Sequence, residues 1–219
     1  DNTVGFTFTS GNSAVATISG RTVTIVGAGS SVITASQAAT ENRAQMDISA
    51  TLVVARQTPV ITLAAITKTY GSAQFRLTPT STNTDDVSGA ALSFTSSNTS
   101  VASIVDTSFV SINGVGEATI TISQAATANF TDGSGSVVVT VNKGIPVLST
   151  LSVSANKTYG SAPFSILTVP TSASAGAITY SSSDTGIATI DNSGVITLIA
   201  AGYVNFTASQ AATALYNSA

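Results

Sequence analysis

The chain of 219 residues contains no cysteine, no histidine and no tryptophan. Without Cys and His it has no disulfides, no thiol nucleophile, no Cys/His metal site and no general base of the usual kind at neutral pH. Charged residues are only 8% of the chain and the net charge is −3, so there is no basic surface for nucleic acid. The longest apolar stretch, at 194–204, is too short and too interrupted to insert into a membrane.

The residues that are abundant favour β-structure. Hydrophobic residues make up 43% of the chain, mostly Val, Ile and Ala, and Ser and Thr together make up roughly a third. β-Branched Val, Ile and Thr favour strands, whereas the strong helix formers Leu, Glu, Lys and Arg are scarce. The composition therefore predicts an all-β protein. Many Ser and Thr residues with few charges are also typical of an extracellular location.

Several short sequence tags recur at a fixed spacing. SQAAT occurs three times, KTYGSA twice, and a V/I-A-S/T-I tag three times at intervals of 86 residues. Because independent landmarks share one period, we interpret the chain as a repeat of about 86–89 residues. The copies start at Ser36, Ser123 and Ser209 for SQAAT, at Lys68 and Lys157 for KTYGSA, and at Val15, Val101 and Ile187 for the third tag.

One period contains several short alternating runs separated by turn-prone residues such as TNTDD at 82–86 and TDGSG at 131–135. In the run at 117–124 the apolar residues Ala118, Ile120 and Ile122 alternate with Thr119 and Thr121, as in a half-buried strand. Seven such strands in about 87 residues predict a tandem array of immunoglobulin-like β-sandwich modules. The predicted strands lie near 59–64, 74–79, 91–96, 101–105, 108–112, 117–124 and 136–142, with Phe94, Val101, Ile104, Ile120 and Ile122 inside.

Two proline-containing linkers, at 55–60 and 142–147, precede new copies of the repeat. We therefore expect the C-terminal part of one module at 1–56, a complete module at 57–142, and a module that lacks its last strand at 143–219. Incomplete sandwiches expose core residues and unpaired strand edges. Either the sequence is cut from a longer repetitive polypeptide, or a neighbouring copy donates the missing strand.

The runs beginning SFTSSNTSVASIVD at 93 and TYSSSDTGIATIDNSG at 179 resemble bacterial immunoglobulin-like repeats, which occur in large surface adhesins and in some phage and giant-virus structural proteins. KTYGSAPF at 157 is similar to the start of one sub-type of these repeats. The resemblance covers essentially the whole chain. It implies the sandwich fold and a role as a stalk, spacer or fibre shaft, and only some such modules bind a ligand.

The KTYGSA tag could form a reactive site, with Lys68 and Lys157 beside Tyr70 and Tyr159. Catalysis would need a base and an oxyanion site, which the repeat does not supply. We predict instead that Gly71 and its counterpart form a turn, that the tyrosine caps the end of the core, and that the lysine stays in water. A Lys–Asn cross-link would need a buried acid in register, and no acid recurs in all copies.

The glutamine of each SQAAT tag could contact ligands along a fibre. Each amide more simply satisfies backbone groups of a loop, as buried polar groups must, and this is our prediction. The run at 27–31 superficially resembles a phosphate loop but lacks its Lys-Ser/Thr ending and the helix that follows. The glutamines concerned are Gln37, Gln124 and Gln210.

Calcium is a candidate ligand because extracellular modules use oxygen ligands to stiffen their junctions. No D-x-D-x-D-G run exists, and no aspartate recurs in all copies, so we predict no metal site. DNSG at 191–194 is predicted to be a hairpin turn. Four glycosylation sequons are the number expected by chance in so Ser/Thr-rich a chain. The candidate acids are Asp85, Asp86, Asp106, Asp132, Asp184 and Asp191, and the sequons are at Asn98, Asn129, Asn156 and Asn205.

The sequence thus predicts no catalytic, cofactor-binding or metal-binding residue and no cofactor. It predicts a non-enzymatic structural protein, an extracellular stalk, fibre or filament shaft on a cell or virion surface, about 35–45 Å long per module. Its expected partners are copies of itself or neighbouring immunoglobulin-like modules. The alternative is an adhesin module that recognises a glycan or host receptor through loops at one end of the sandwich. Phe and Tyr are predicted mostly in strands or in the repeated turn, which favours the structural role.

Overall fold

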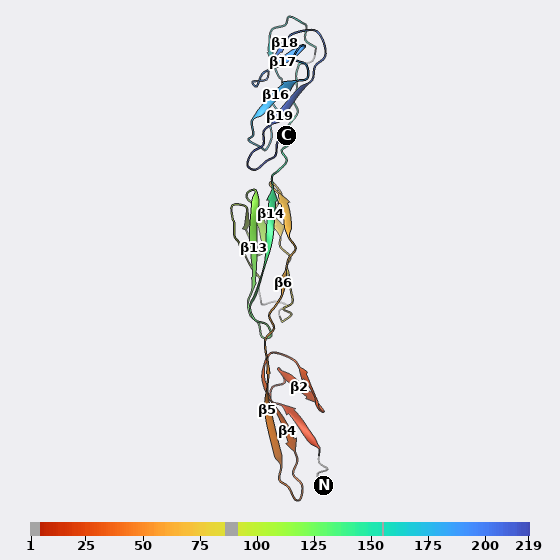
Figure 1. Cartoon of the computed structure of the whole chain (residues 1–219), viewed down its shortest axis with the longest axis vertical. Helices are drawn as coiled ribbons and strands as arrows, with labels where there is room; N and C mark the ends of the chain where they lie inside the picture. Colours follow the sequence, from red (N-terminus) through yellow and green to blue (C-terminus); the bar gives the residue numbers. More distant parts are fainter. Residues whose placement is uncertain (1–4, 86–91, 155) are drawn as a thin grey trace.

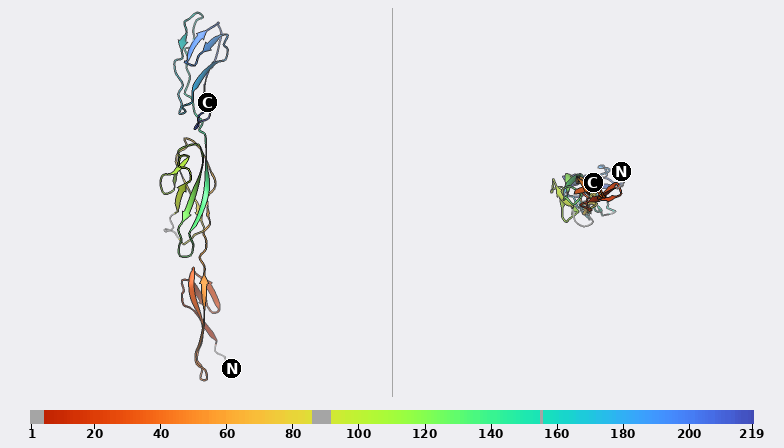
Figure 2. Two further views of the ribbon diagram at one scale, coloured as in Figure 1. Left: turned by 60° about the vertical axis from the view of Figure 1, so that its left-hand side comes forward. Right: turned by 90° about the horizontal axis from the view of Figure 1, so that it is seen from below.

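The computed structural model describes residues 5–85, 92–154 and 156–219, which form strands, turns and loops without a helix. In the part described there is accordingly no helix able to cross a membrane. Three modules follow one another along one long axis, with the N-terminal module at the bottom of Figure 1 and the C-terminal module at the top. Seen end-on, in the right-hand view of Figure 2, the modules lie over one another within one narrow outline.

The central module, which corresponds to the predicted complete copy, is a β-sandwich. One sheet has the order β10-β13-β14-β7 and the other the order β11-β12-β8, with a two-stranded β6-β9 ribbon beside them. Its pairings are antiparallel except for β7 with β14, which run parallel. The strands are β6 (Ile61–Thr62), β7 (Ile66–Thr69), β8 (Phe75–Arg76), β9 (Thr80–Ser81), β10 (Ser93–Ser96), β11 (Ala102–Ile104), β12 (Phe109–Ile112), β13 (Gly116–Gln124) and β14 (Gly133–Asn142).

The core of the central module lies between its sheets and follows the predicted alternation. Ala118, Ile120 and Ile122 of β13 are buried, whereas Thr121 is exposed and Thr119 half-buried. Partly buried Phe94 and Ile104 pack against the same core, so the predicted inward positions are confirmed. The buried cluster consists of Leu77, Val101, Ala102, Val110, Ala118, Ile120, Val137, Val139 and Val141.

The first part of the module differs from the prediction. The strand expected at 59–64 is only β6, and β7 at Ile66–Thr69 was missed. β6 pairs with β9. The chain then crosses to the four-stranded sheet, where β7 pairs with β14. Likewise the strand expected at 74–79 splits into β8 and β9, because Pro79 between them has no N–H to donate to a ladder.

Glycines that were predicted to form a turn at 131–135 lie in a strand. β14 begins at Gly133, three residues before the expected start. A Cβ on Gly133 would lie 2.5 Å from Pro59 Cγ, and one on Gly135 would lie 2.7 Å from Ile61 O. These residues are glycine because the segment around β6 passes directly over β14.

The first module has two small sheets, β1-β4-β5 and β2-β3. Its β5 corresponds to β14, but its inward residues Leu52 and Val54 are only half-buried, whereas their counterparts Val139 and Val141 are 0% and 2% exposed. Ile48, at the position of Gly135, is 68% exposed. The described residues 5–56 include no counterpart of β6 to β9 to cover them. The strands are β1 (Phe6–Ser10), β2 (Ala16–Ser19), β3 (Thr22–Ile25), β4 (Gly29–Gln37) and β5 (Met46–Val54).

The third module has sheets β16-β19 and β15-β18-β17 around a small core that includes Ile166, Ala188 and Ile196. Its strand β19 begins only at Phe206. Tyr203 therefore lies in a loop and is fully exposed, an exception to the prediction that Phe and Tyr lie mostly in strands or in the repeated turn. The strands are β15 (Phe164–Ser165), β16 (Ile178–Ser182), β17 (Ala188–Ile190), β18 (Val195–Leu198) and β19 (Phe206–Gln210).

Candidate functional site at the module junctions

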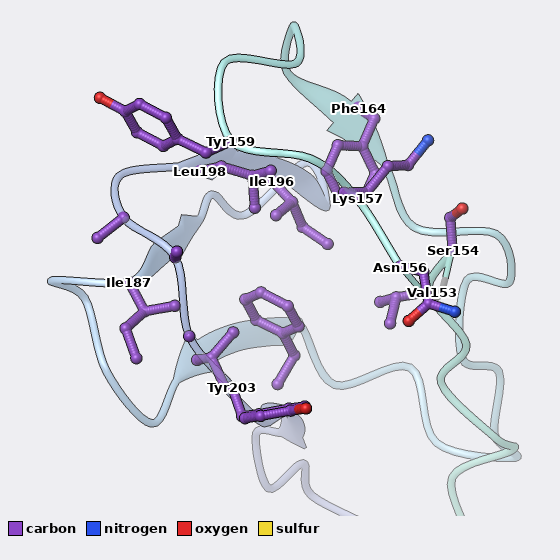
Figure 3. A pocket seen from close by; sticks show the side chains of 15 residues that line it. Val153, Ser154, Asn156, Lys157, Tyr159, Phe164, Ile187, Ile196, Leu198 and Tyr203 are labelled. Carbon is purple, nitrogen blue, oxygen red and sulfur yellow. The ribbon is translucent and has the colours of Figure 1, made fainter.

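The KTYGSA tag is part strand and part turn. Lys68 lies in β7, and the turn follows at Gly71, whose φ of 89° favours glycine. Its counterpart Gly160 has a φ of 86°. The prediction that the lysine simply stays in water is wrong for Lys68. Its Nζ lies 4.8 Å from the centroid of the Phe75 ring. Lys157 repeats this contact on Phe164 at 4.8 Å (Figure 3), so the repeated pair is a cation–π contact at the edge of each core.

The tyrosine of the tag behaves differently in the two copies. Tyr70 packs against the core of the central module, as predicted. Tyr159 is 67% exposed, so the prediction is wrong for the third module. Tyr70 also meets Tyr216 of the third module, edge to face, with ring centroids 5.4 Å apart. The tag in the central module thus contributes to a junction between modules.

Two SQAAT glutamines hold loops in place. Gln210 Nε2 donates to Ser174 O at 2.9 Å and to Gly176 O at 2.8 Å, and its Oε1 accepts from Ser172 Oγ. Gln124 Oε1 accepts from Ser81 Oγ in the corresponding place. Both side chains are buried. The prediction that the glutamine amide serves a loop backbone is confirmed for Gln210.

The aspartates considered for calcium are dispersed. Asp106, Asp184 and Asp191 each accept hydrogen bonds from backbone N–H groups of their own loops. Asp191 closes the predicted DNSG turn, in which Gly194 has a φ of 76°. Asp86 lies outside the described residues. Within the described ranges no three His, Cys, Asp or Glu residues come close enough together to hold a metal ion.

We expect a chelator to leave the thermal unfolding of the chain unchanged, because these carboxylates are already engaged by backbone N–H groups. The measurement is the melting temperature in about 1 mM EDTA against about 1 mM Ca²⁺, since extracellular sites bind calcium at up to millimolar concentrations. A clear drop in EDTA would contradict this expectation and point to the loop that carries Asp85.

Asp85 instead fixes an asparagine that reaches the first module. Its Oδ2 accepts from Thr127 Oγ1 at 2.8 Å and from Asn129 N at 2.6 Å, and its Oδ1 accepts from Asn129 Nδ2 at 2.7 Å. With its amide nitrogen held, Asn129 presents Oδ1 to the first module, where it accepts from Ala28 N at 2.6 Å. Ala28 lies in the run that superficially resembled a phosphate loop. Its N–H binds a neighbouring module.

Backbone hydrogen bonds tie the first linker to the same loop. Gln57 N donates to Asn129 O and Thr131 N donates to Gln57 O, both at 2.9 Å, so Gln57 pairs in parallel with Phe130. Phe130 is 6% exposed. The linker therefore enters the central module as part of its hydrogen-bonded structure.

The second junction repeats the backbone pattern with different side chains. Gly144 N donates to Leu215 O at 2.9 Å and Asn217 N donates to Gly144 O at 2.8 Å, which gives the same parallel bridge to Tyr216. Lys143 Nζ donates to Thr213 O at 2.7 Å. A Cβ on Gly144 would lie 2.8 Å from the Tyr216 ring and 2.9 Å from Tyr70 O. Glycine at this linker position therefore allows Tyr70 and Tyr216 to pack directly against the linker backbone.

The hydrogen bonds from Asn129 and Thr127 lower the pKa of Asp85 from its ordinary value of 3.8, the Asn129 side chain contributing most. A carboxyl whose pKa is depressed on folding stabilises the folded chain above its unfolded pKa, and this contribution is lost as the pH falls through the folded pKa. We therefore expect the melting temperature of the native chain to fall more steeply than that of Asp85→Asn below about pH 4. The measurement is thermal unfolding between about pH 6 and pH 2.5. Parallel pH profiles would contradict the assignment.

Comparison with known protein families gives a match within the central module. Residues 84–126 match the family model for "Intimin, immunoglobulin-like domain". The central module is thus similar to a bacterial immunoglobulin-like domain. No curated protein sequence matches the chain. Within the central module the matched segment runs from the Asp85 loop through β13 to the SQAAT tag.

Solved structures similar to the chain include Drosophila N-cadherin EC1-4, at 12% identity, with 95% of this chain and 63% of that chain covered and a TM-score of 0.34. Domains 4 and 5 of the S-layer protein SbsC are 19% identical, with 64% of this chain and 72% of that chain covered and a TM-score of 0.31. The chain thus spans less than two thirds of the N-cadherin fragment.

Proposed function

We propose that the chain is a stiff, non-catalytic stretch of an extracellular stalk or fibre, on a cell or virion surface, that joins end to end with further immunoglobulin-like modules or copies of itself. One observation carries this proposal. At both junctions the linker is hydrogen-bonded into the base of the next module, and the side chains around it close on the preceding module. A flexible linker would have no need of these contacts.

The role needs no chemistry from the side chains. Low charge and surfaces rich in Ser and Thr suit lateral packing against neighbouring stalks. The match of the central module to the intimin immunoglobulin-like domain supports a surface location. The side chains that perform the role are those that hold one module against the next, with Asn129 at the first junction and Tyr70 and Tyr216 at the second.

Small-angle X-ray scattering tests the proposal. Three modules of about 35–45 Å held in line should give a maximum dimension of about 105–135 Å and the profile of a single rod. The double variant Asn129→Ala/Tyr216→Ala should give a broader, shorter distance distribution, because each junction loses a side-chain contact. The matched control Asn205→Ala/Tyr203→Ala removes the same residue types from exposed positions and should scatter like the native chain. Identical scattering from the native chain and the junction variant would refute the stiff-stalk proposal.

A further inference from the structure

The strand that leads into the SQAAT tag has an edge strand beside it in the central and third modules. In the central module the edge strand is β10, which pairs with β13, and β14 lies on the far side of β13. β10 is therefore an edge strand even where the sheet is complete. In the third module the edge strand is β16, which pairs with β19. In Figure 1, β13 lies to the left of β14 and β16 to the left of β19, so both edges lie on the left of the view.

The backbone of β10 has unpaired groups on its outer side. Ser97 N donates to Thr119 O at 2.9 Å, so by alternation Thr95 also directs its N–H and C=O toward β13. Phe94 and Ser96 therefore direct theirs away from the sheet. Within the described ranges neither residue has a backbone hydrogen-bond partner on that side.

The same edge recurs in the third module. Ser183 N donates to Asn205 O at 2.9 Å, which leaves the backbone groups of Tyr180 and Ser182 directed outward by the same alternation. These two residues lie 86 positions after Phe94 and Ser96. The outward-facing backbone groups thus repeat with the period of the modules.

The two sides of the central module differ in charge. On one side the edge strands β7 and β8 carry Lys68 and Arg76, and charged residues on an edge strand oppose pairing with another chain. On the other side, residues 92–105, which include β10, contain neither a charged residue nor a proline. Residues 177–183, which include β16, contain none either. Only this side of the sandwich therefore lacks the usual obstacles to edge pairing.

We infer that β10 and β16 together form a lateral interaction surface, and that its partner is a second copy of this chain aligned in parallel beside the first. β10 would pair with β10 of the second copy, and β16 with β16, in parallel as β7 pairs with β14. Each short ladder is weak alone, but two ladders on one chain reinforce each other. A partner engages both edges at once only if its modules have the same spacing, which favours another copy of the repeat. The inference rests on the proposed stalk function, because a stiff chain holds its edges in line.

Sedimentation equilibrium of the intact chain tests the inference. The monomer mass is 21.7 kDa, and we expect a reversible dimer to form between about 1 µM and about 1 mM. Thr95→Lys/Ser181→Lys adds one cation to an exposed position of each edge strand and should raise the dimer dissociation constant at least about tenfold, because like charges would meet at the paired edges. The matched control Thr67→Lys/Thr69→Lys adds the same charge to exposed positions of β7, at the other edge of the sheet. It should change the constant by less than about threefold, because salt screens charges over about 8 Å.

Amide hydrogen exchange of the native chain locates the surface without any substitution. Raising the protein concentration should slow exchange at Phe94, Ser96, Tyr180 and Ser182 and leave the amides of β7 unchanged. Three results would overturn the inference: a chain that stays monomeric at about 1 mM, equal weakening by the two lysine pairs, or a dimer in which these four amides still exchange freely. The scattering test of stiffness uses dilute monomer, so the two proposals fail separately. A rod that never dimerises refutes the edge pairing alone, and a flexible chain that dimerises through these amides refutes the stiff stalk alone.

Discussion

Replacing Ile120 with alanine is expected to destabilise the central module by about 2–5 kcal/mol, the range for truncation of large core residues. Ile120 is 0% exposed and lies at the centre of β13, paired with both β10 and β14. Removing its outer methyl groups leaves a cavity that two hydrogen-bonded neighbours cannot close. The measurement is urea unfolding of a fragment that comprises residues 57–142.

The matched control is Thr121→Ala, one residue further along the same strand. Thr121 is exposed, so its truncation should change the free energy of unfolding by no more than about 0.5 kcal/mol. Equal losses at the two positions would show that the inward and outward faces of β13 are assigned wrongly.

Gly135→Ala should also destabilise the module, by about 1–3 kcal/mol, the usual cost of overpacking. The sign is the informative part, because alanine in place of glycine ordinarily strengthens a strand. Here the new Cβ would lie 2.7 Å from Ile61 O and 3.2 Å from Ile61 Cβ, so the backbone of β6 has to move. The same unfolding experiment measures it, with exposed Ser136→Ala as the control, expected within about 0.5 kcal/mol. A Gly135→Ala module as stable as the native one would mean that β6 does not press on β14.

The features predicted correctly from the sequence are those that follow from a regular spacing of residues. The 86-residue period gave the tandem modules, and alternation in β13 gave the buried face with Ile120 at its centre. The crossing from β6 to β7 was missed because it depends on a change of sheet, which leaves no periodic trace in a segment as short as Ile66–Thr69. The sequence does not distinguish Gly133 and Gly135 from turn residues, because glycine is used both where two backbones approach closely and where a turn needs it.

The junction residues were harder to predict for a related reason. Asn129 and Tyr216 are not strictly repeated: Leu215 stands in the place of Asn129, and Phe130 in the place of Tyr216. A search for recurring tags passes over residues that differ between copies, although such residues are the ones that adapt each junction to its own neighbour. Gly144, which stands where the first linker has Gln57, is the one such difference that could have indicated the second junction. It is glycine because the Tyr216 ring lies close to the backbone there.

The parallel pairing of β7 with β14 determines how the central module carries tension. Force on the chain enters through the linker before β6 and leaves through the C-terminal end of β14. Val139, Thr140, Val141 and Asn142 pair in register with Ile66, Thr67, Lys68 and Thr69. Because the two strands are parallel, pulling them from opposite ends shears the ladder, and its hydrogen bonds share the load instead of opening one after another. We therefore expect the pairing of β7 with β14 to resist extension of this module.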